Sequence, residues 1–463
     1  MIFQDIDQLK KGIGGTVEVV GANVAILNES KLRESLIDEL IFTAVFSADD
    51  GVKEAARWLI RRAGVSLGVV SLSIQPLYDA MGKQEVTGFT VPAINLRGIT
   101  YSSAQAVFRA ALKGNVGALI FEIARSEIGY TGQRPEEYTA AVTAAAIKTG
   151  FTGPLFLQGD HFQINAKKFA DNPEAEVSGV RDLIREAIAG GFYNIDIDSS
   201  TVVDLSKPTI KEQQENNYRI NAELTALIRT LEPEGITVSV GGEIGEVGGK
   251  NTTVEEFKIF MDSYLEVLNE QGSGLKGISK ISIQTGTTHG GVPLPDGTIA
   301  SVKIDFDTLQ NISSVARSNY GLAGAVQHGA STLPREAFNK FPATQTAEIH
   351  LATGFQNIIY DSEHFPGGLR NRIYEFINTE LRGEKKAQDT EEQFIYKTRK
   401  KGFGRFKKDM WDLPPRLLGD IGGELENQFS FLFVQLNVLN TADTVANCVK
   451  LVDVPLAVPS SLT

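Results

Sequence analysis

Eight short apolar segments alternate with helical segments through most of this 463-residue chain. Each is rich in branched residues and bounded by glycine or polar residues, a pattern typical of a buried strand. Helical patterns such as residues 103–114, 136–150 and 178–191 separate them and end at glycine, as helices commonly do. Strands separated by such helices form right-handed parallel units. The expected strands are residues 91–96, 117–124, 154–160, 193–199, 237–244, 280–287, 322–329 and 355–362.

Eight units of this kind predict an α/β fold, a closed (β/α)8 TIM barrel, which typically takes ~250 residues. Because the chain is longer, we expect additional helices at both ends. We assign residues 75–370 to the barrel, 1–74 to an N-terminal helical extension and 371–463 to a C-terminal helical extension. The N-terminal extension holds a predicted helical pair, and the C-terminal one is too apolar near its end to lie free in water. We therefore expect it to pack on the barrel or on another subunit.

Composition and charge exclude several classes of protein. A net charge of −12 argues against nucleic-acid binding, which needs a basic face. The one basic run, Lys397 to Lys408, is interpreted as a solvated helix end or a subunit contact, with binding of an anionic partner as the alternative. The single cysteine, Cys448, excludes an internal disulfide framework and suits a reducing compartment. Neither a secretory signal nor a ~20-residue membrane span is visible, so we expect a cytoplasmic protein.

Three of the five histidines end predicted strands. His161, His289 and His328 follow the third, sixth and seventh apolar segments. The carboxyl ends of barrel strands meet at one rim, where barrel enzymes carry their active sites. Three imidazoles with an open coordination position are typical of a catalytic metal site. His350 and His364 lack this setting, since one lies in an apparent helix and the other in a loop, and we expect neither to be a ligand.

Carboxylates gather at the same rim. Asp160 directly precedes His161, and Asp196 and Asp198 alternate along the fourth strand, which places both on one face. Glu243 ends the fifth strand. Because buried carboxylates are costly unless they bind metal, pair or take protons, we expect functional roles for Asp160, Asp198 and Glu243.

Small residues follow the last two predicted strands. Gly329 and Ser331 follow the seventh strand, and Asp361 and Ser362 close the eighth. The loops after strands seven and eight often hold phosphate in barrels of this type. These four residues are therefore candidate phosphate-binding residues.

The order of these motifs resembles the class II, metal-dependent fructose-bisphosphate aldolases. The motifs are VPAIN, GDH, IDSS, GEIGEVGG, GTTHGG and QHGAS, and the resemblance spans about residues 75–365. It implies that His161, His289 and His328 bind the catalytic metal and that Asp160 moves the proton of the C4 hydroxyl. It further implies roles for Asp198 and Glu243 in metal binding. Residues implied to bind substrate or phosphate are Asn95, Gly290, Gly329, Ser331, Asp361 and Ser362.

This chain also departs from the family pattern around the ketose half of the substrate. The glutamate that commonly follows the fifth-strand motif is replaced by Lys250, Asn251 and Thr252. Glu246 and Glu255 are the nearest acidic candidates for its role, and Glu246 is preferred. The eighth predicted strand carries Ile359 where the family has an asparagine, and Ala124 replaces a serine of strand two.

The resemblance implies a carbon–carbon lyase of carbohydrate metabolism, such as glycolysis. The default reaction is reversible aldol cleavage of fructose 1,6-bisphosphate to dihydroxyacetone phosphate and an aldehyde. Zn²⁺ or another divalent metal is the implied cofactor, with a monovalent cation as an accessory. A homo-oligomer, dimer or tetramer, is expected. The alternatives are a different ketose phosphate, including tagatose bisphosphate or a sulfonated ketose phosphate, and a non-catalytic phosphate-binding barrel.

Two other chemistries are disfavoured by the sequence. A Schiff-base aldolase needs a lysine at the carboxyl end of a strand, and Lys280 begins the sixth strand instead. A metal-dependent barrel hydrolase usually carries an HxH pair on the first strand, and the segment VPAINL has no histidine.

Overall fold

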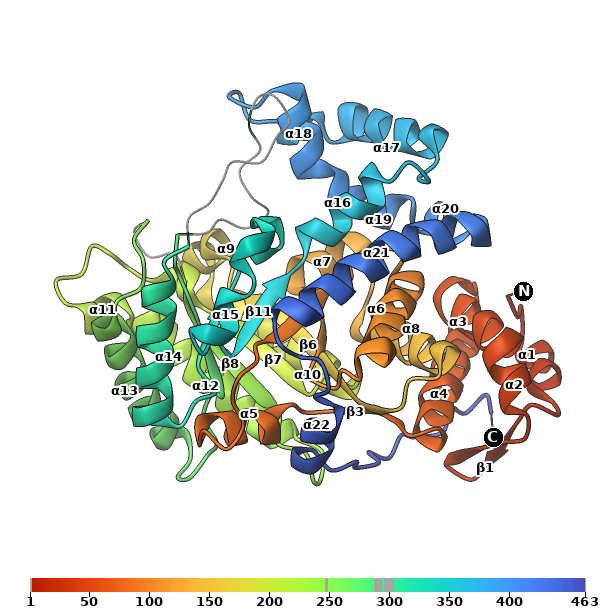
Figure 1. Ribbon diagram of the computed structural model, residues 1–463, viewed down its shortest axis with the longest axis horizontal. Coiled ribbons are helices and arrows are strands. Elements are labelled where there is room, and N and C mark those ends of the chain that lie inside the picture. Colours follow the sequence, from red (N-terminus) through yellow and green to blue (C-terminus); the bar gives the residue numbers. More distant parts are fainter. Residues whose placement is uncertain (1, 246–248, 287–293, 295–303, 463) are drawn as a thin grey trace.

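The computed structural model describes residues 2–245, 249–286, 294 and 304–462. Its centre is a closed barrel of eight parallel strands surrounded by helices, with further helices at both termini (Figure 1). The barrel closes where β11 pairs with β4 and where β6 pairs with β7. The barrel strands are β4 (Val91–Asn95), β5 (Ile120–Ala124), β6 (Gly153–Gln163), β7 (Asn194–Asp198), β8 (Ser239–Gly245), β9 (Lys280–Ile283), β10 (Ala325–Gln327) and β11 (Glu348–Leu351). The predicted fold class is confirmed.

Each barrel strand is followed by helix, as the sequence periodicity predicts. Polar N-caps fix several starts: Asn172 accepts a hydrogen bond from Ala175 N, and Thr253 with Glu256 forms a capping box. The outer helices are α6 (Thr100–Gly114), α7 (Arg125–Thr131), α8 (Pro135–Thr149), α9 (Ala166–Asp171), α10 (Pro173–Ala189), α11 (Ile210–Gln213), α12 (Glu215–Leu231), α13 (Val254–Gln271), α14 (Phe306–Tyr320), α15 (Lys340–Ala343) and α16 (Thr353–Asp361). Short 3₁₀ turns η2 (Ser200–Val202), η3 (Ala330–Thr332) and η4 (Arg335–Ala337) lie in the loops.

The prediction for the eighth strand is wrong. Residues 353–361 form the helix α16, and the strand is β11, four residues long and directly before it. The segment FQNIIYD carries apolar residues at helical spacing as well as in a run, and short apolar runs do not separate the two states. Residues of β11 alternate inward polar with outward apolar side chains, so its hydrophobic run is broken.

The N-terminal extension forms a layer on one side of the barrel. The predicted helical pair is present as η1 (Leu32–Leu36, a π-helical turn) with α3 (Ile37–Phe46), and α4 (Asp50–Ser66). Asp49 caps α4 by accepting from Val52 N. The strand β3 (Val69–Leu72) then pairs with the first half of β6. The layer also holds α1 (Ile6–Ile13), the hairpin β1 (Val17–Val20) and β2 (Asn23–Ile26), and α2 (Glu29–Lys31). The helix α5 (Gln75–Gly82) lies apart from this layer, beneath the barrel, and contacts α14 and α22 (Figure 1).

The C-terminal extension covers one end of the barrel and then runs down its side. Its first half lies over the end where α16 emerges, and α21 packs along α6 (Figure 1). Phe429 of α21 contacts Phe355 at 4.8 Å between ring centroids. None of the described helices is long and apolar enough to span a membrane. The elements are α17 (Gly367–Glu380), η5 (Arg382–Glu384), α18 (Glu391–Thr398), η6 (Arg399–Lys401), α19 (Gly402–Arg405), α20 (Lys407–Trp411), α21 (Pro415–Gln435) and α22 (Ala442–Cys448).

Candidate active site

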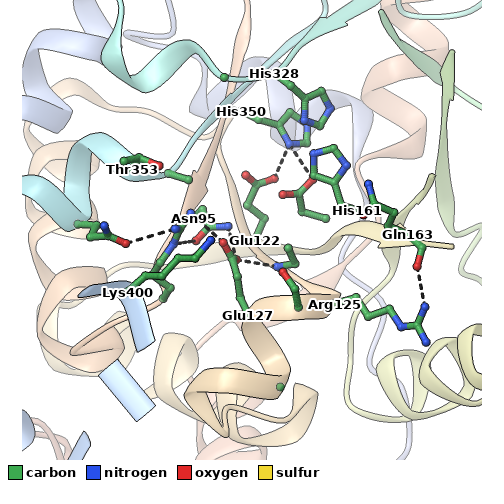
Figure 2. Close-up of a pocket in the computed structure, with 18 of the residues that line it drawn as sticks. Asn95, Glu122, Arg125, Glu127, His161, Gln163, His328, His350, Thr353 and Lys400 are labelled. Atoms are coloured by element: carbon green, nitrogen blue, oxygen red, sulfur yellow. Dashed lines mark hydrogen bonds and ion pairs between the residues drawn. The ribbon is translucent and has the colours of Figure 1, made fainter. Parts of the chain in front are cut away.

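A cavity of about 720 Å³ opens at the carboxyl ends of the barrel strands. Its floor is built from acidic side chains and imidazoles, and basic side chains line the opposite wall (Figure 2). Six predicted site residues line it directly. They are Asn95, Asp160, His161, His328, Gly329 and Ser331. His289 and Gly290 lie outside the described residues, as does Glu246.

Asp160 and His161 reach the same cavity because β6 carries a bulge at this point. Its register against β7 shifts between Gly159 and Phe162, so that two residues of β6 stand against one of β7. In a regular strand adjacent side chains point to opposite faces. His161 adopts φ of 41°, a left-handed conformation that is uncommon outside glycine and concentrates at functional sites. The bulge therefore turns both side chains toward the cavity.

Two groups of donor atoms around His161 can hold a metal ion. Asp160, His161 and His328 each offer one atom within 4.8 Å of the others, and so do His161, Asp198 and Glu243. His161 Nδ1 lies 3.3 Å from Asp198 Oδ2 and 3.2 Å from Glu243 Oε2. Imidazole nitrogens with nearby carboxylates suit zinc and related divalent ions. The donor set thus fits the predicted metal, and the third predicted ligand, His289, lies outside the described residues.

The charges of these carboxylates and imidazoles depend strongly on one another. Burial lowers the pKa of His161, but Asp160 and Glu243 outweigh it and hold that pKa well above its usual value. Burial, reinforced by Asp198, raises the pKa of Glu243 to about 7. Burial also disfavours ionised Asp198, but hydrogen bonding from His161 prevails and lowers its pKa. A metal ion at this position would replace the proton on His161 as the positive partner.

His350 lines the cavity, whereas the sequence pattern predicts a helix there and no role as a metal ligand. It belongs to β11, is buried, and stacks on His328 at 4.0 Å between ring centroids. Its Nδ1 lies 2.9 Å from Glu122 Oε2 and 3.2 Å from Asp160 Oδ1. The alternation of polar and apolar residues in EIHLAT was the available sequence signal.

Beneath His350, a lysine and two carboxylates fill the barrel interior. Lys280 is 1% exposed, and its Nζ lies 2.9 Å from Asp196 Oδ2 and also pairs with Glu348. Despite burial, these two carboxylates raise the pKa of Lys280, which stays protonated. A Schiff-base lysine must be neutral to attack a carbonyl, and Lys280 does not line the cavity. The structure therefore disfavours that route, as the position of Lys280 in the sequence predicts.

On the opposite wall, Asn95 is fixed by hydrogen bonds to charged neighbours. Its Nδ2 donates to Glu127 Oε2 at 2.6 Å, and its Oδ1 accepts from Arg97 Nε at 3.3 Å. Arg97 in turn pairs with Glu127 at 2.7 Å. This wall therefore presents the amide of Asn95 in a fixed orientation, beside the Arg97–Glu127 ion pair, whose charges offset each other. Neither Arg97 nor Glu127 was expected from the sequence.

The loops after β10 and β11 meet at the rim of the cavity. Gly329, with φ of 67°, directly precedes η3, and Ser331 Oγ accepts a hydrogen bond from Gly354 N at 3.1 Å. A Cβ on Gly354 would approach Ser331 O to 2.7 Å, so the close contact requires glycine. The helix α16 begins here without a side-chain cap, and its first residue, Thr353, lines the cavity. Such a helix start is suited to binding an anion.

Asp361 and Ser362 do not reach this rim. They lie at the far end of α16, where Asp361 pairs with Arg399 and Ser362 Oγ donates to Glu424 Oε1 at 2.7 Å. Their assignment as the phosphate loop depended on placing the eighth strand at 355–362. The structure puts Ala352 and Thr353 in that position instead. The apparent replacement at Ile359 has the same origin.

The C-terminal extension contributes basic side chains to the cavity. Tyr396, Lys397 and Lys400 all line it. The segment is held on α16 because Arg399 pairs with Asp361 and Tyr396 Oη accepts from Asn357 Nδ2 at 3.0 Å. Lys400 has no carboxylate partner within the described chain, and burial together with nearby Arg97 lowers its pKa. The basic run thus faces the cavity as well as solvent, which favours the anion-binding interpretation.

Of the two candidate replacements for the missing loop glutamate, the preferred one, Glu246, lies outside the described residues, and Glu255 is not in the cavity. Glu255 lies in the first turn of α13, is exposed and does not line the cavity. Glu122 does line it, is fully buried and was missed. Burial, with Asp160 nearby, raises the pKa of Glu122 to about 7.

A (β/α)8 barrel with histidines and carboxylates that could hold a metal ion at the carboxyl ends of its strands has the arrangement of a barrel enzyme. The model of the class II fructose-bisphosphate aldolase family matches residues 76–402. The chain belongs to this family. No curated protein matches the sequence significantly.

Solved structures share the fold at low sequence identity. The fructuronate-tagaturonate epimerase UxaE of Cohnella laeviribosi is 11% identical over 82% of this chain and 85% of that one, with a TM-score of 0.53. A protein named as a tagatose 6-phosphate kinase from Sinorhizobium meliloti is 17% identical over 81% and 96%, with a TM-score of 0.52. Fructose-bisphosphate aldolase of Campylobacter jejuni is 17% identical over 81% and 96%, with a TM-score of 0.47.

Proposed function

We propose that the protein is a metal-dependent aldolase that reversibly cleaves a phosphorylated ketose, with fructose 1,6-bisphosphate as the default substrate. The observation that carries this proposal is the convergence of Asp160, His161 and His328 on one cavity at the strand ends. Family membership makes dihydroxyacetone phosphate and an aldehyde the expected products. The alternative ketose phosphates named above share the same chemistry.

Cleavage beside a carbonyl leaves an electron pair on carbon, which needs a stabilising positive centre. His161, His328 and His289 would hold a divalent ion, which would supply this centre as a Lewis acid. Asp198 and Glu243 hold His161 in place through its Nδ1. Asp198 and Glu243 would therefore fix the position of the ion through His161 and balance its positive charge.

Asp160 is the proposed proton carrier. Its carboxylate faces the cavity beside His161, where it can accept the proton of the C4 hydroxyl as the bond breaks. In the condensation direction it returns that proton. Asn95, fixed by Glu127 and Arg97, is positioned to hydrogen-bond substrate hydroxyls from the other wall.

The anionic end of the substrate is proposed to bind at the rim between η3 and α16. Gly329 and Ser331 lie there beside the start of α16, and Lys400 faces the same cavity. Binding energy from this end would fix the reacting carbons against Asp160. Thr353, rather than Asp361 or Ser362, supplies the side of the rim that follows the eighth strand.

The test is release of dihydroxyacetone phosphate from a panel of ketose phosphates, with and without a chelator. We expect chelation to abolish cleavage and divalent metal to restore it. His161→Ala and His328→Ala should lose cleavage, whereas His364→Ala, a half-exposed histidine outside the cavity, should retain it. Full activity after exhaustive chelation would contradict the metal-dependent mechanism. A metal-bound protein inactive on every ketose phosphate would favour the non-catalytic binding barrel.

A further inference from the structure

A second group of metal-ligand side chains lies deeper in the barrel than the pair of clusters around His161. Glu122, Asp160 and His350 each place one donor atom within 4.8 Å of the others, and all three are buried. They come from β5, β6 and β11 (Figure 2). We propose that these three residues bind a second divalent metal ion, separate from the one at His161 and His328.

The orientation of His350 suits a ligand. Its Nε2 lies 2.6 Å from Glu348 Oε1, and a carboxylate at that distance favours the proton on Nε2. Glu348 is itself held by Lys280 and accepts from Gln158 Nε2 at 2.9 Å. The lone pair of Nδ1 then faces Glu122 and Asp160. A carboxylate behind a metal-binding imidazole is the usual arrangement that fixes its tautomer.

Glu122 supplies an independent observation. It is 0% exposed, and its Oε1 has no hydrogen-bond partner within the described part of the chain. Its Oε2 accepts a hydrogen bond from Gln158 Nε2 at 3.2 Å and faces His350. A buried carboxylate oxygen without a partner is costly, and a cation beside it removes that cost.

The distribution of charged side chains in the barrel interior also favours a cation between Glu122 and Asp160. Lys280 stands against Asp196 and Glu348, and His161 stands against Asp198 and Glu243. Among the described residues, the imidazole of His350 lies between Glu122 and Asp160. A divalent ion would balance both carboxylates and allow His350 to act as a neutral ligand.

One imidazole nitrogen and two carboxylate oxygens suit Mn²⁺, Co²⁺ or Zn²⁺. All three residues line the cavity, so an ion and a substrate oxygen can enter from the same side. Asp160 belongs to both this cluster and the one with His161 and His328. The second site would therefore lie directly beside the first.

The experiment counts metal ions in the full-length chain. Chelator-treated protein is equilibrated with Zn²⁺, dialysed and analysed for bound zinc. We expect two ions per chain in the parent protein and one each in Glu122→Gln, His350→Gln and His161→Ala. His364→Gln, which alters a histidine outside the cavity, should keep two. Mn²⁺ bound at the second site should show the altered electron spin resonance of a fixed ligand set, which Glu122→Gln removes.

One ion in the parent under saturating zinc would overturn the proposal. Two ions retained in both Glu122→Gln and His350→Gln would also overturn it, because the second ion would then lie elsewhere. Glu122→Gln keeps the side-chain shape, so it can test the second site even if His350→Gln does not fold. The number of zinc ions bound by the parent protein tests the proposal independently of both variants. Metal counting needs no turnover, so inactivity on ketose phosphates would contradict the proposed function and leave this inference standing.

Discussion

At the scale of single residues, the site depends on a local distortion of one strand. The bulge in β6 places Asp160 and His161 on the same side, at the cost of a left-handed backbone at His161. Such conformations persist only where the surrounding structure holds them. Here Asp198 and Glu243 hold the imidazole from the neighbouring strands. The proton carrier and the metal ligand can therefore act on the same substrate atom from adjacent positions.

Replacing Asp160 by asparagine tests its role as proton carrier. We expect Asp160→Asn to lower kcat by ~10²–10⁴-fold, the usual effect of losing a general acid–base group. The amide keeps an oxygen of similar size, so the ion at His161 and His328 should remain bound. Steady-state kinetics and metal analysis on the same preparation check both outcomes. A loss below threefold would mean that another group moves the proton.

Lys280 is expected to stabilise the fold rather than to perform chemistry. Lys280→Met would leave Asp196 and Glu348 buried without their cation, which should lower the free energy of unfolding by about 3–5 kcal/mol. Denaturant unfolding measures the change. Lys276→Met is the matched control, because Lys276 pairs with Asp79 at the surface and should cost at most ~1 kcal/mol. Equal stability of the two variants would refute this role.

The sequence predicts those site residues that follow recognisable strand motifs. His161 and His328 stand at the ends of short apolar runs, and their position in the cavity follows from the alternation of strand and helix. His350 and Glu122 could not be assigned this way, because their strands place polar groups inside the barrel where a pattern of buried apolar residues is expected. Arg97 and Lys400 reach the cavity only through the path of loops and terminal helices, which local pattern does not specify.

At the scale of secondary-structure elements, the C-terminal extension completes the wall of the cavity. The segment from α18 to η6 is attached to α16 by Arg399 and Tyr396, and this attachment brings Lys400 over the rim. Seven of the eight predicted strands correspond to barrel strands. The eighth failed because β11 has four residues and alternates polar with apolar, whereas the following helix contains the apolar run Ile358–Tyr360. The contacts that favour β11 are distant in sequence, since it pairs with β4.

Lys400 offers a test of this arrangement. Lys400→Gln should raise KM for the phosphorylated substrate by ~10-fold or more with little change in kcat, since a charged hydrogen bond contributes about 1.5–3 kcal/mol. Lys400→Arg should restore most of the affinity. Lys401→Gln removes the same charge from the next residue, which pairs with Glu384 outside the cavity, and should leave KM unchanged. A KM within twofold of the parent in Lys400→Gln would exclude this contact.

At the scale of the whole molecule, the barrel interior concentrates negative charge that a metal would offset. Burial raises the pKa of Glu122 to about 7 and that of Asp196 to about 6, although Lys280 opposes the latter. Both values lie above those of the unfolded chain, near 4.5 and 3.8. At pH values between the unfolded and the folded pKa of each group, the folded state therefore retains a proton that the unfolded state has released. The metal-free fold loses stability as these protons leave.

We accordingly expect metal-free protein to be less stable at pH 7.5 than at pH 5.5. His161 and His350, whose pKa values are raised, act in the same direction. Glu348, with its pKa lowered to about 2, contributes stability that is lost only below pH ~4.5. Urea unfolding of chelator-treated protein at both pH values checks the sign, and added zinc should reduce or reverse the difference. A free energy of unfolding that is higher at pH 7.5 than at pH 5.5 in the metal-free protein would contradict this prediction.

The bidentate pair between Arg62 of α4 and Asp453 near the C-terminus has a consequence for the order of folding during translation. Its two contacts, at 2.6 and 2.8 Å, join residues 391 positions apart, and Arg62 is only 3% exposed. The ribosome must therefore add almost four hundred residues after Arg62 before this guanidinium can meet its carboxylate. Until then the emerging N-terminal layer keeps an unpaired cation on the surface that the tail will later cover. The contact that Arg62 of the N-terminal layer makes with Asp453 can therefore form only after almost all of the barrel has been synthesised.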